Sequence, residues 1–276
     1  MEFYRVACYD TYMRNKTLLA LDIDDTLVPF DHQFLGLEKI QNIGKIIKNI
    51  PNCILGYPTG RSFLQTVKAL GKYVLPPADF LICSNGASIF FHETKWIEDL
   101  EYENFLTKQN PDFNREKISK ILISTFSFLQ EAEKERQNKM RGVFFIDPDK
   151  NAIEAMKEIK QLFLSKNILN TRLIPAFDLR AGMSILDVLP NRVSKLAGLQ
   201  YVAKKFNIAE ENIIFAGDGI NDLEVFTSNL KSIIVGNADE KLKEKIKKHG
   251  SNNAYFAKEN FVDGVVEGLE YWGKIT

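Results

Sequence analysis

Cysteine is scarce in this chain of 276 residues, and the positions of the few cysteines exclude some classes of site. Cys8, Cys53 and Cys83 are scattered, their number is odd, and no pair has the CxxC spacing. This usage is typical of buried thiols in a reducing cytosol and gives no indication of a zinc site. We therefore expect a cytoplasmic protein.

An excess of one charge and a long apolar run are also missing. Lys and Arg together number 36, as do Asp and Glu, so the basic excess of a non-specific nucleic-acid binder is absent. No stretch of about 18 apolar residues occurs, so we expect no membrane span. The first 16 residues have neither an unbroken apolar core nor a small-residue cleavage site, so they do not resemble a signal peptide. The composition is that of an ordinary soluble globular protein, which we expect to be a monomer or small homo-oligomer.

Apolar runs alternate with helical patterns near both ends of the chain. Strands are expected at 17–24, 53–57 and 80–83. Helices are expected between them at 38–50 and 61–70. Gly71 is predicted to end the second helix, and the same alternation returns after Pro190. Continuously apolar strands separated by helices are typical of a parallel sheet covered on both faces. The pattern predicts the α/β class, with a Rossmann-like core formed by residues 1–92 and 187–276.

The middle of the chain has a different pattern. Long charged stretches such as 114–137 are predicted to be helical, and strand-like runs interrupt them. These runs lie at 142–146, 171–177 and 182–188. The mixture indicates a smaller α+β domain with its own sheet, inserted into the core at 93–186.

Acidic residues follow two of the predicted strands. Asp22 and Asp24 end the first strand, whereas Asp218 and Asp222 stand four residues apart around a glycine turn in "GDGIND". Ligands of an open parallel sheet bind beyond the carboxyl ends of its strands, so neighbouring strands would bring Asp22 and Asp218 into one crevice. Clustered carboxylates repel one another, and a hard divalent cation such as Mg²⁺ neutralises them.

The same residue types suit phosphoryl transfer. An aspartate can form an aspartyl-phosphate intermediate. The DxD spacing then lets Asp22 attack phosphorus, while Asp24 protonates the leaving oxygen and later deprotonates water. Such a transfer depends mainly on positioning and charge stabilisation. Thr59, ahead of an expected helix start, and Lys195, at the start of a later helix, are placed to bind the phosphate.

Four motifs in this order resemble those of the haloacid dehalogenase-like hydrolase superfamily: "DIDDT", "PTGR", "SKLAGL" and "GDGIND". The insertion lies between the second and third motifs, as in members with a C2-type cap, which include the Cof-like sugar phosphatases and the sucrose-phosphate phosphatases. The resemblance runs across most of the chain from about residue 17. The stretches "SILDVLPNRVSKLAGLQYVAKKF" and "VGNADEKLKE" look like the sucrose-phosphate phosphatase branch.

This resemblance implies roles for the matching residues. Asp22 is the expected nucleophile, Asp24 the general acid/base, and Asp25 only a turn residue. The expected phosphate- and substrate-binding residues are Thr59, Gly60, Arg61, Lys195 and Asn221. The expected Mg²⁺ site consists of Asp22, the backbone carbonyl of Asp24, Asp218 and Asp222, with Asn221 and Asp222 supporting the metal's waters and the lysine. The cap is expected to select the substrate, and its polar residues that could touch a sugar are Lys139, Arg141, Asp178 and Arg180.

The sequence therefore predicts a Mg²⁺-dependent phosphatase that acts on a phosphorylated sugar or a similar small metabolite. Two alternatives stay open: a phosphomutase that uses the same aspartyl-phosphate, and a non-catalytic phosphate-binding regulator on the same fold. A regulator would not need Asp24, so the presence of this residue favours an enzyme. The histidines His32, His92 and His249 adjoin no GxSxG motif, which argues against a Ser-His-Asp hydrolase.

Overall fold

The computed structural model describes residues 16–29, 37–178 and 181–275. The expectations for Cys8, His32, Arg180 and the N-terminal segment concern positions outside these ranges. The chain divides into two compact units. The first contains the residues up to Glu98 and those from Lys195 onward, and the second contains residues 99–194.

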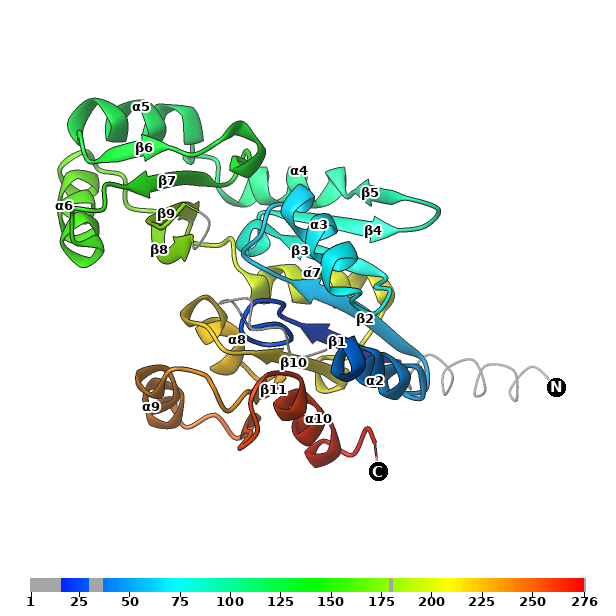
Figure 1. The fold of residues 1–276 in the computed structure, drawn as a ribbon. Helices are drawn as coiled ribbons and strands as arrows, with labels where there is room; N and C mark the ends of the chain where they lie inside the picture. The colour runs from blue at the N-terminus through cyan, green and yellow to red at the C-terminus, as the bar shows by residue number, and fades with distance from the viewer. Residues whose placement is uncertain (1–15, 30–36, 179–180, 276) are drawn as a thin grey trace. The chain divides into compact units, whose positions relative to one another are not determined.

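The first unit is built on a sheet of eight strands in the order β12-β11-β10-β1-β2-β3-β4-β5 (Figure 1). Neighbouring strands are parallel from β12 to β3, whereas the pairs β3–β4 and β4–β5 are antiparallel. The strands are β1 (Thr17–Leu21), β2 (Cys53–Pro58), β3 (Phe80–Cys83), β4 (Ser88–His92), β5 (Trp96–Glu98), β10 (Ile213–Gly217), β11 (Lys231–Ile234) and β12 (Ala254–Phe256). The predicted α/β class with a mainly parallel sheet is confirmed.

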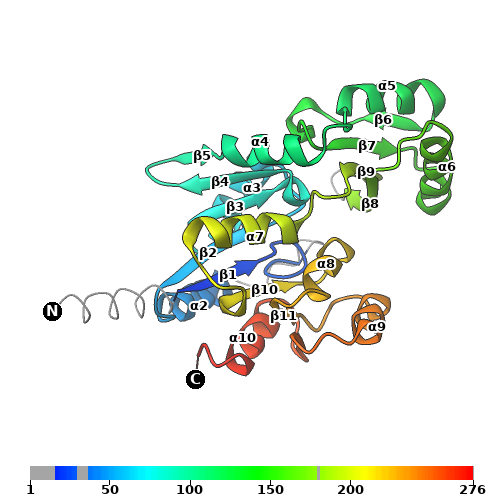
Figure 2. The ribbon, with the colours of Figure 1, turned by 180° about the vertical axis from the view of Figure 1, so that it is seen from behind.

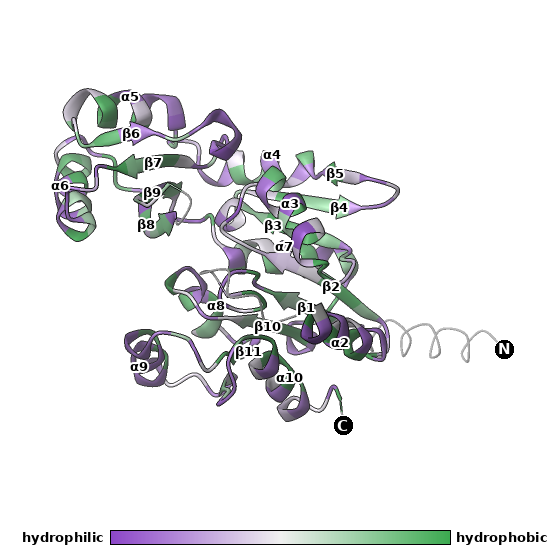
Figure 3. Ribbon diagram, in the orientation of Figure 1, coloured by the Kyte–Doolittle hydropathy of each residue, from purple (hydrophilic) through white to green (hydrophobic). Residues whose placement is uncertain are grey.

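Helices cover both faces of this sheet (Figures 1 and 2). The helices of the first unit are α2 (Leu37–Lys48), α3 (Phe63–Tyr73), α7 (Lys195–Phe206), α8 (Leu223–Phe226), α9 (Glu240–His249) and α10 (Phe261–Tyr271). On one face, α2, α3 and α10 share a hydrophobic cluster with strand residues such as Leu19 and Leu55. On the other face, α7 approaches β3 so closely that a Cβ atom on Gly198 would lie 2.8 Å from the side chain of Ile82. Covering on both faces explains why β1 is buried at every residue and apolar from Leu18 to Leu21 (Figure 3).

The end of α3 differs from the prediction. Gly71 is expected to end this helix, but α3 continues to Tyr73. The Tyr73 side chain is buried, whereas a Cβ atom on Gly71 would have no other atom within 4 Å. Val74 then ends the helix in the left-handed conformation, with φ 52°. The buried aromatic side chain in the last turn therefore outweighs the weak helix propensity of glycine.

The second unit has an antiparallel sheet of four strands in the order β6-β7-β9-β8. Its strands are β6 (Leu129–Glu131), β7 (Gly142–Ile146), β8 (Thr171–Asp178) and β9 (Met183–Pro190), and its helices are α4 (Leu100–Gln109), α5 (Arg115–Thr125) and α6 (Ala152–Ser165). Leu122 of α5 and Ile159 of α6 pack in one hydrophobic cluster with Phe144 and Leu186 of the sheet. The unit therefore has its own core, separate from that of the first unit.

The predicted helix at 114–137 is wrong beyond residue 125. The helix α5 ends at Thr125, Phe126 is extended, and the strand β6 follows. Phe126, Phe128 and Leu129 all contribute to the core cluster of the second unit. Leu129 also pairs with Ile146 of β7. Pairing with a neighbouring strand thus overrides the local helical preference of the charged residues that follow.

The boundaries between the units also differ by a few residues from the predicted insertion at 93–186. The strand β5 pairs with β4 in the sheet of the first unit, so the insertion begins later than expected. The strand β9 pairs along its full length with β8, so the insertion also ends later. None of the helices that the structure describes is both long and apolar enough to cross a bilayer.

Candidate active site

The carboxyl ends of β1 and β10 bring two of the predicted acids together. These strands are parallel neighbours, with Leu21 opposite Ala216, so both strands end at the same edge of the sheet. Asp22 follows β1 directly, and its backbone N–H donates to the carbonyl of Ala216 at 2.9 Å. Asp218 follows β10. The topology therefore places both side chains at the edge where parallel sheets bind their ligands.

Lys195 connects this edge to the helix α7. Its ammonium nitrogen lies 2.5 Å from Oδ2 of Asp22 and 2.7 Å from Oδ1 of Asp222. Lys195 and Asp222 are fully buried, and Asp22 is 5% exposed. Burial alone would lower the pKa of Lys195, but the attraction of Asp22 and Asp222 raises it above its usual value. Lys195 therefore stays charged and balances part of the negative charge of the acids.

Three carboxylates converge within a small volume. One oxygen each of Asp22, Asp218 and Asp222 can be chosen so that all three lie within 4.8 Å of one another. Burial raises the pKa of Asp22 to about 7; the attraction of Lys195 opposes this shift, and repulsion from Asp222 adds to it. Burial and repulsion from Asp22 and Asp222 raise the pKa of Asp218 well above its usual value. One lysine is thus insufficient to neutralise the cluster.

This donor set fits a hard divalent cation. Carboxylate oxygens are the ligands that Mg²⁺ prefers in proteins. Burial, and after it repulsion among the carboxylates, disfavours the ionised forms of Asp22 and Asp218, and a bound cation would relieve both effects. The carboxylates of Asp22, Asp218 and Asp222 therefore form a donor set whose chemistry fits a divalent cation such as Mg²⁺. The carboxylate of Asp24 is engaged elsewhere, which leaves its backbone carbonyl as the predicted ligand.

Arg61 fixes the side chain of Asp24. Its Nε donates to Asp24 Oδ2 at 2.7 Å, and its Nη2 donates to Oδ1 at 2.5 Å. This two-point contact joins the loop after β2 to the turn after β1, and both side chains are partly exposed. Planar guanidinium pairs of this kind define orientation as well as charge. The predicted general acid/base therefore has a defined position, and the predicted substrate contact of Arg61 stays a prediction.

Thr59 and Gly60 form the first part of the same loop. Thr59 is fully buried, its backbone N–H donates to Ile82 at 2.8 Å, and its hydroxyl accepts from the N–H of Arg61 at 3.1 Å. A Cβ atom on Gly60 would lie 3.2 Å from Oδ1 of Asn85. Gly60 is thus a point of close approach between two loops rather than a position with an unusual backbone angle.

The "GDGIND" segment forms a compact turn after β10. The short helix η4 (Ile220–Asp222) begins at Gly219, whose N–H donates to Oδ2 of Asp222 at 3.1 Å. The Asn221 amide donates to Oδ1 of Asn85 at 3.0 Å. A Cβ atom on Gly219 would lie 2.4 Å from Oδ1 of Asn221, so this glycine makes room for the asparagine.

Comparison with known proteins assigns the chain to a family. The model of the sucrose-6F-phosphate phosphohydrolase family matches residues 15–273. The chain belongs to this family. It is therefore a phosphoric monoester hydrolase, and the predicted resemblance to the C2-capped haloacid dehalogenase-like phosphatases is confirmed.

Several characterised phosphatases are similar to this member of the sucrose-6F-phosphate phosphohydrolase family. Mannosylfructose-phosphate phosphatase of Agrobacterium fabrum is 24% identical over 95% of this chain and 98% of that protein. The 5-amino-6-(5-phospho-D-ribitylamino)uracil phosphatase of Bacillus subtilis is 24% identical over 92% of this chain and 95% of that protein. The solved structure of sucrose-phosphatase from Synechocystis sp. PCC6803, in complex with sucrose and phosphate, has a TM-score of 0.77 at 20% identity, covering 94% of this chain and 98% of that one. At this identity the structural likeness establishes the fold.

Two residues near the site of this family member have no predicted role. Thr26 is fully buried and donates its hydroxyl to Oδ1 of Asp218 at 2.6 Å. The sequence does indicate Thr26 as a residue of the site, because it is the last residue of the "DIDDT" motif. Asn85 was indicated only as part of a turn in "SNG", and nothing in that turn signal points to Asn221, 136 residues later.

The predicted sugar-contacting residues of the cap all belong to the second unit. The side chain of Arg141 is buried and pairs with Asp187 through two hydrogen bonds, of 2.8 and 2.9 Å. Asp178 pairs with Arg136, and Lys139 pairs with Glu103 at 3.0 Å. Each of these three residues thus has an ion partner within the second unit, and Arg180 lies outside the described residues.

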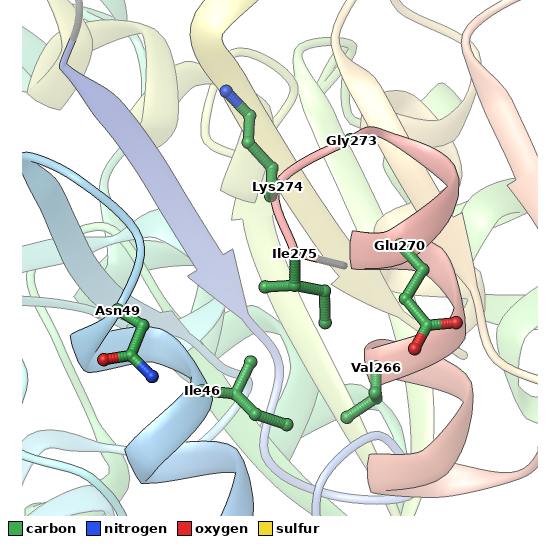
Figure 4. Close-up of a pocket in the computed structure, with 7 residues that line it drawn as sticks. All are labelled: Ile46, Asn49, Val266, Glu270, Gly273, Lys274 and Ile275. Atoms are coloured by element: carbon green, nitrogen blue, oxygen red, sulfur yellow. The ribbon is translucent and has the colours of Figure 1, made fainter.

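A cavity of about 360 Å³ lies between α2 and α10 (Figure 4). Lys274, which lines it, donates to the hydroxyl of Thr17 at the start of β1. The lining residues are Ile46, Asn49, Val266, Glu270, Gly273, Lys274 and Ile275. Glu270 is its only carboxylate, so among the described residues the cavity lacks the cluster of acids found at the carboxyl ends of the strands.

Proposed function

We propose that this protein is a Mg²⁺-dependent phosphatase that hydrolyses a phosphorylated sugar, or a similar small metabolite, through an aspartyl-phosphate intermediate. The observation that carries the proposal is the ion pair between buried Lys195 and Asp22, beside the carboxylates of Asp218 and Asp222. A buried carboxylate in such surroundings is suited to nucleophilic attack because water and competing reactions are limited.

In the first step, a carboxylate oxygen of Asp22 attacks the phosphorus atom of the substrate. A bond forms between that oxygen and phosphorus, and the bond from phosphorus to the sugar oxygen breaks. Asp24 gives its proton to the departing oxygen, so the sugar leaves as an alcohol. Arg61 donates to both oxygens of the ionised Asp24, so we propose that one of these hydrogen bonds opens when Asp24 carries the proton and that the other keeps the side chain in place.

In the second step, water attacks the phosphorus atom of the aspartyl-phosphate. Asp24, now ionised, accepts a proton from the water, and the bond between Asp22 and phosphorus breaks. Inorganic phosphate is released, and Asp22 returns to its carboxylate form. Asp24 returns to its protonated form, so both acids are restored for the next cycle.

The remaining residues of the site are proposed to bind the phosphoryl group and the metal and to balance their charges. Lys195 attracts both the Asp22 carboxylate and the anionic phosphoryl group, while Thr59, Gly60 and Asn221 are proposed to bind phosphate oxygens. The residues proposed to hold the metal are Asp22, Asp24 through its backbone carbonyl, Asp218 and Asp222. When bound, Mg²⁺ supplies positive charge against the phosphoryl oxygens and the clustered carboxylates.

The second unit is proposed to act as the cap that selects the substrate. Two of the similar proteins are named for phosphorylated or free sugars, mannosylfructose phosphate and sucrose, which supports a sugar phosphate here. The polar side chains of the second unit are the proposed contacts for the sugar hydroxyls. We further propose a cytoplasmic monomer or small homo-oligomer without nucleic-acid partners.

The decisive experiment measures phosphate release by the purified protein, with Mg²⁺, from a panel of sugar phosphates that includes sucrose 6-phosphate and hexose phosphates. D22N should abolish turnover of every substrate, and D24N should lower it strongly. D25N is the matched control, since it changes a neighbouring acid without a proposed role, and it should retain activity. Full activity of D22N would overturn the nucleophile assignment. Conversion of a hexose 1-phosphate to a 6-phosphate without phosphate release would instead show a mutase.

A further inference from the structure

The turn between β3 and β4 has an unusual backbone. Three consecutive residues of the short helix η1 (Ser84–Gly86) have positive φ angles, of 57° at Ser84, 56° at Asn85 and 98° at Gly86. L-residues seldom adopt this region, and serine does so less readily than asparagine. Strain of this kind persists where the surrounding structure requires it, often close to a functional site.

The backbone of this turn holds the loop after β2. The N–H of Ser84 donates to the carbonyl of Arg61 at 2.8 Å, and the N–H of Asn85 donates to the carbonyl of Thr59 at 3.0 Å. The left-handed conformation turns both N–H groups toward this loop. The turn therefore fixes the segment that carries Thr59, Gly60 and Arg61.

The side chain of Asn85 reaches the second loop of the site. Asn85 is 4% exposed, and its Oδ1 accepts from the Asn221 amide at 3.0 Å. The same oxygen lies next to Gly60, where a Cβ atom would be 3.2 Å away and in tight contact with it. One buried side chain thus lies between the loop after β2 and the loop after β10, and contacts both.

We infer that Asn85 is a positioning residue, which sets the distance and orientation between the loop of Thr59–Arg61 and the loop of Asn221. This inference rests on the proposed function, because both loops are proposed to bind the phosphate. A purely structural role of this turn predicts a different result. Glycine adopts positive φ more readily than asparagine, so a turn that only connects two strands would accept glycine at position 85 without loss.

The test compares N85G, N221A and the double variant N85G/N221A, with N52G as the matched control. Asn52 also has a positive φ angle, of 51°, and lies before β2, where its carbonyl accepts from the N–H of Thr17 at the start of β1. N85G removes the side chain and keeps the backbone N–H, so its melting temperature should be close to that of the wild type. Its kcat should fall about tenfold or more, since small misplacements of binding groups slow catalysis strongly. N52G should keep the wild-type kcat.

The double variant tells whether Asn85 acts through Asn221. Because the two residues act as a unit, the kcat of N85G/N221A should lie within about twofold of the kcat of the slower single variant. Amide hydrogen exchange should also be faster across residues 217–222 in N85G and unchanged in N52G. A kcat of N85G equal to that of the wild type, or effects of N85G and N221A that multiply, would overturn the inference.

The exchange measurement separates this inference from the proposed function. If the wild type releases no phosphate, or if D22N stays active, the proposed function fails. Faster exchange across 217–222 in N85G alone would then still establish that Asn85 positions the second loop. Unchanged exchange in N85G would refute the positioning role whatever the activity measurements show.

Discussion

Lys195 and Asp22 form an ion pair of 2.5 Å inside the protein, although they are 173 positions apart in the sequence. The pair joins the start of α7 to the end of β1. Buried charges are tolerated only when they are paired, and Lys195 is the partner of both Asp22 and Asp222. The lysine therefore contributes to the stability of the first unit as well as to the proposed chemistry.

Replacing this lysine should affect both properties. K195M should lower kcat about a thousandfold, because the charge that faces the phosphoryl group is removed. It should also lower the free energy of unfolding by about 3 to 5 kcal/mol, since two buried carboxylates lose their cation. The measurements are phosphate release and urea unfolding. K204M, on the exposed side of the same helix, is the control, and it should change stability by no more than about 0.5 kcal/mol. Equal stability of K195M and K204M would contradict the ion-pair argument.

Metal binding should be visible without any measurement of activity. A ligand that binds only the folded state at a hundred times its Kd stabilises by about 2.7 kcal/mol, which raises the melting temperature by roughly 5 °C or more. Saturating Mg²⁺ should therefore raise the melting temperature of the wild type. D218N should lose this response, because it removes one carboxylate and keeps the oxygen that accepts from Thr26. D263N changes a half-exposed acid of α10 that pairs with Lys39 away from the candidate site, and it should respond like the wild type. A shift of equal size in D218N would place the metal elsewhere.

Much of the site could be predicted because it lies where regular elements end. Asp22 follows an unbroken apolar strand, and Asp218 follows another, so the rule for parallel sheets was sufficient to bring them together. The strands predicted at 80–83 and 142–146 agree with β3 and β7 residue for residue. Continuous apolar runs of this kind have few alternatives, since either face exposed to water would be unfavourable.

Tertiary contacts explain what the sequence could not predict. The link from Asn85 to Asn221 joins two loops through a single side chain, and no local pattern encodes such a pairing. The two hydrogen bonds from Arg61 to Asp24 are of the same type. The strand β6 was also missed, because its three residues are too few to show alternation and the pairing with β7 lies outside the segment itself.

The pair of Arg61 and Asp24 gives a prediction about leaving groups. A nitrophenolate departs as a stable anion, whereas a sugar oxygen needs a proton when it departs. If Arg61 orients Asp24 as the acid, R61A should slow turnover of a sugar phosphate more than that of p-nitrophenyl phosphate, by about tenfold. R61K should recover only part of this loss, because lysine lacks the planar pair of donors.

The control for Arg61 is another ion pair of the first unit. Lys39 lies 2.5 Å from Asp263 on the surface, and K39A removes that pair without touching the candidate site. K39A should leave the ratio of the two activities unchanged. An equal loss for both substrates in R61A would show that Arg61 does not act through Asp24.

Glu267 on α10 provides a prediction about acid stability. Partial burial alone would raise its pKa, but hydrogen bonds from the N–H groups of Glu259 and Lys258 and from the Tyr255 hydroxyl lower it below the ordinary 4.5. Since the folded-state pKa lies below that of the unfolded chain, the ionised carboxylate stabilises the fold above pH 4.5. This contribution is lost as the pH falls through the folded-state pKa. E267Q should therefore be less stable than the wild type in urea at pH 7, and the difference should narrow progressively below pH 4.5. E244Q, at an exposed glutamate of α9, should show no such pH-dependent difference in stability. A stability difference between E267Q and the wild type that stays constant below pH 4.5 would rule out the carboxylate as its cause.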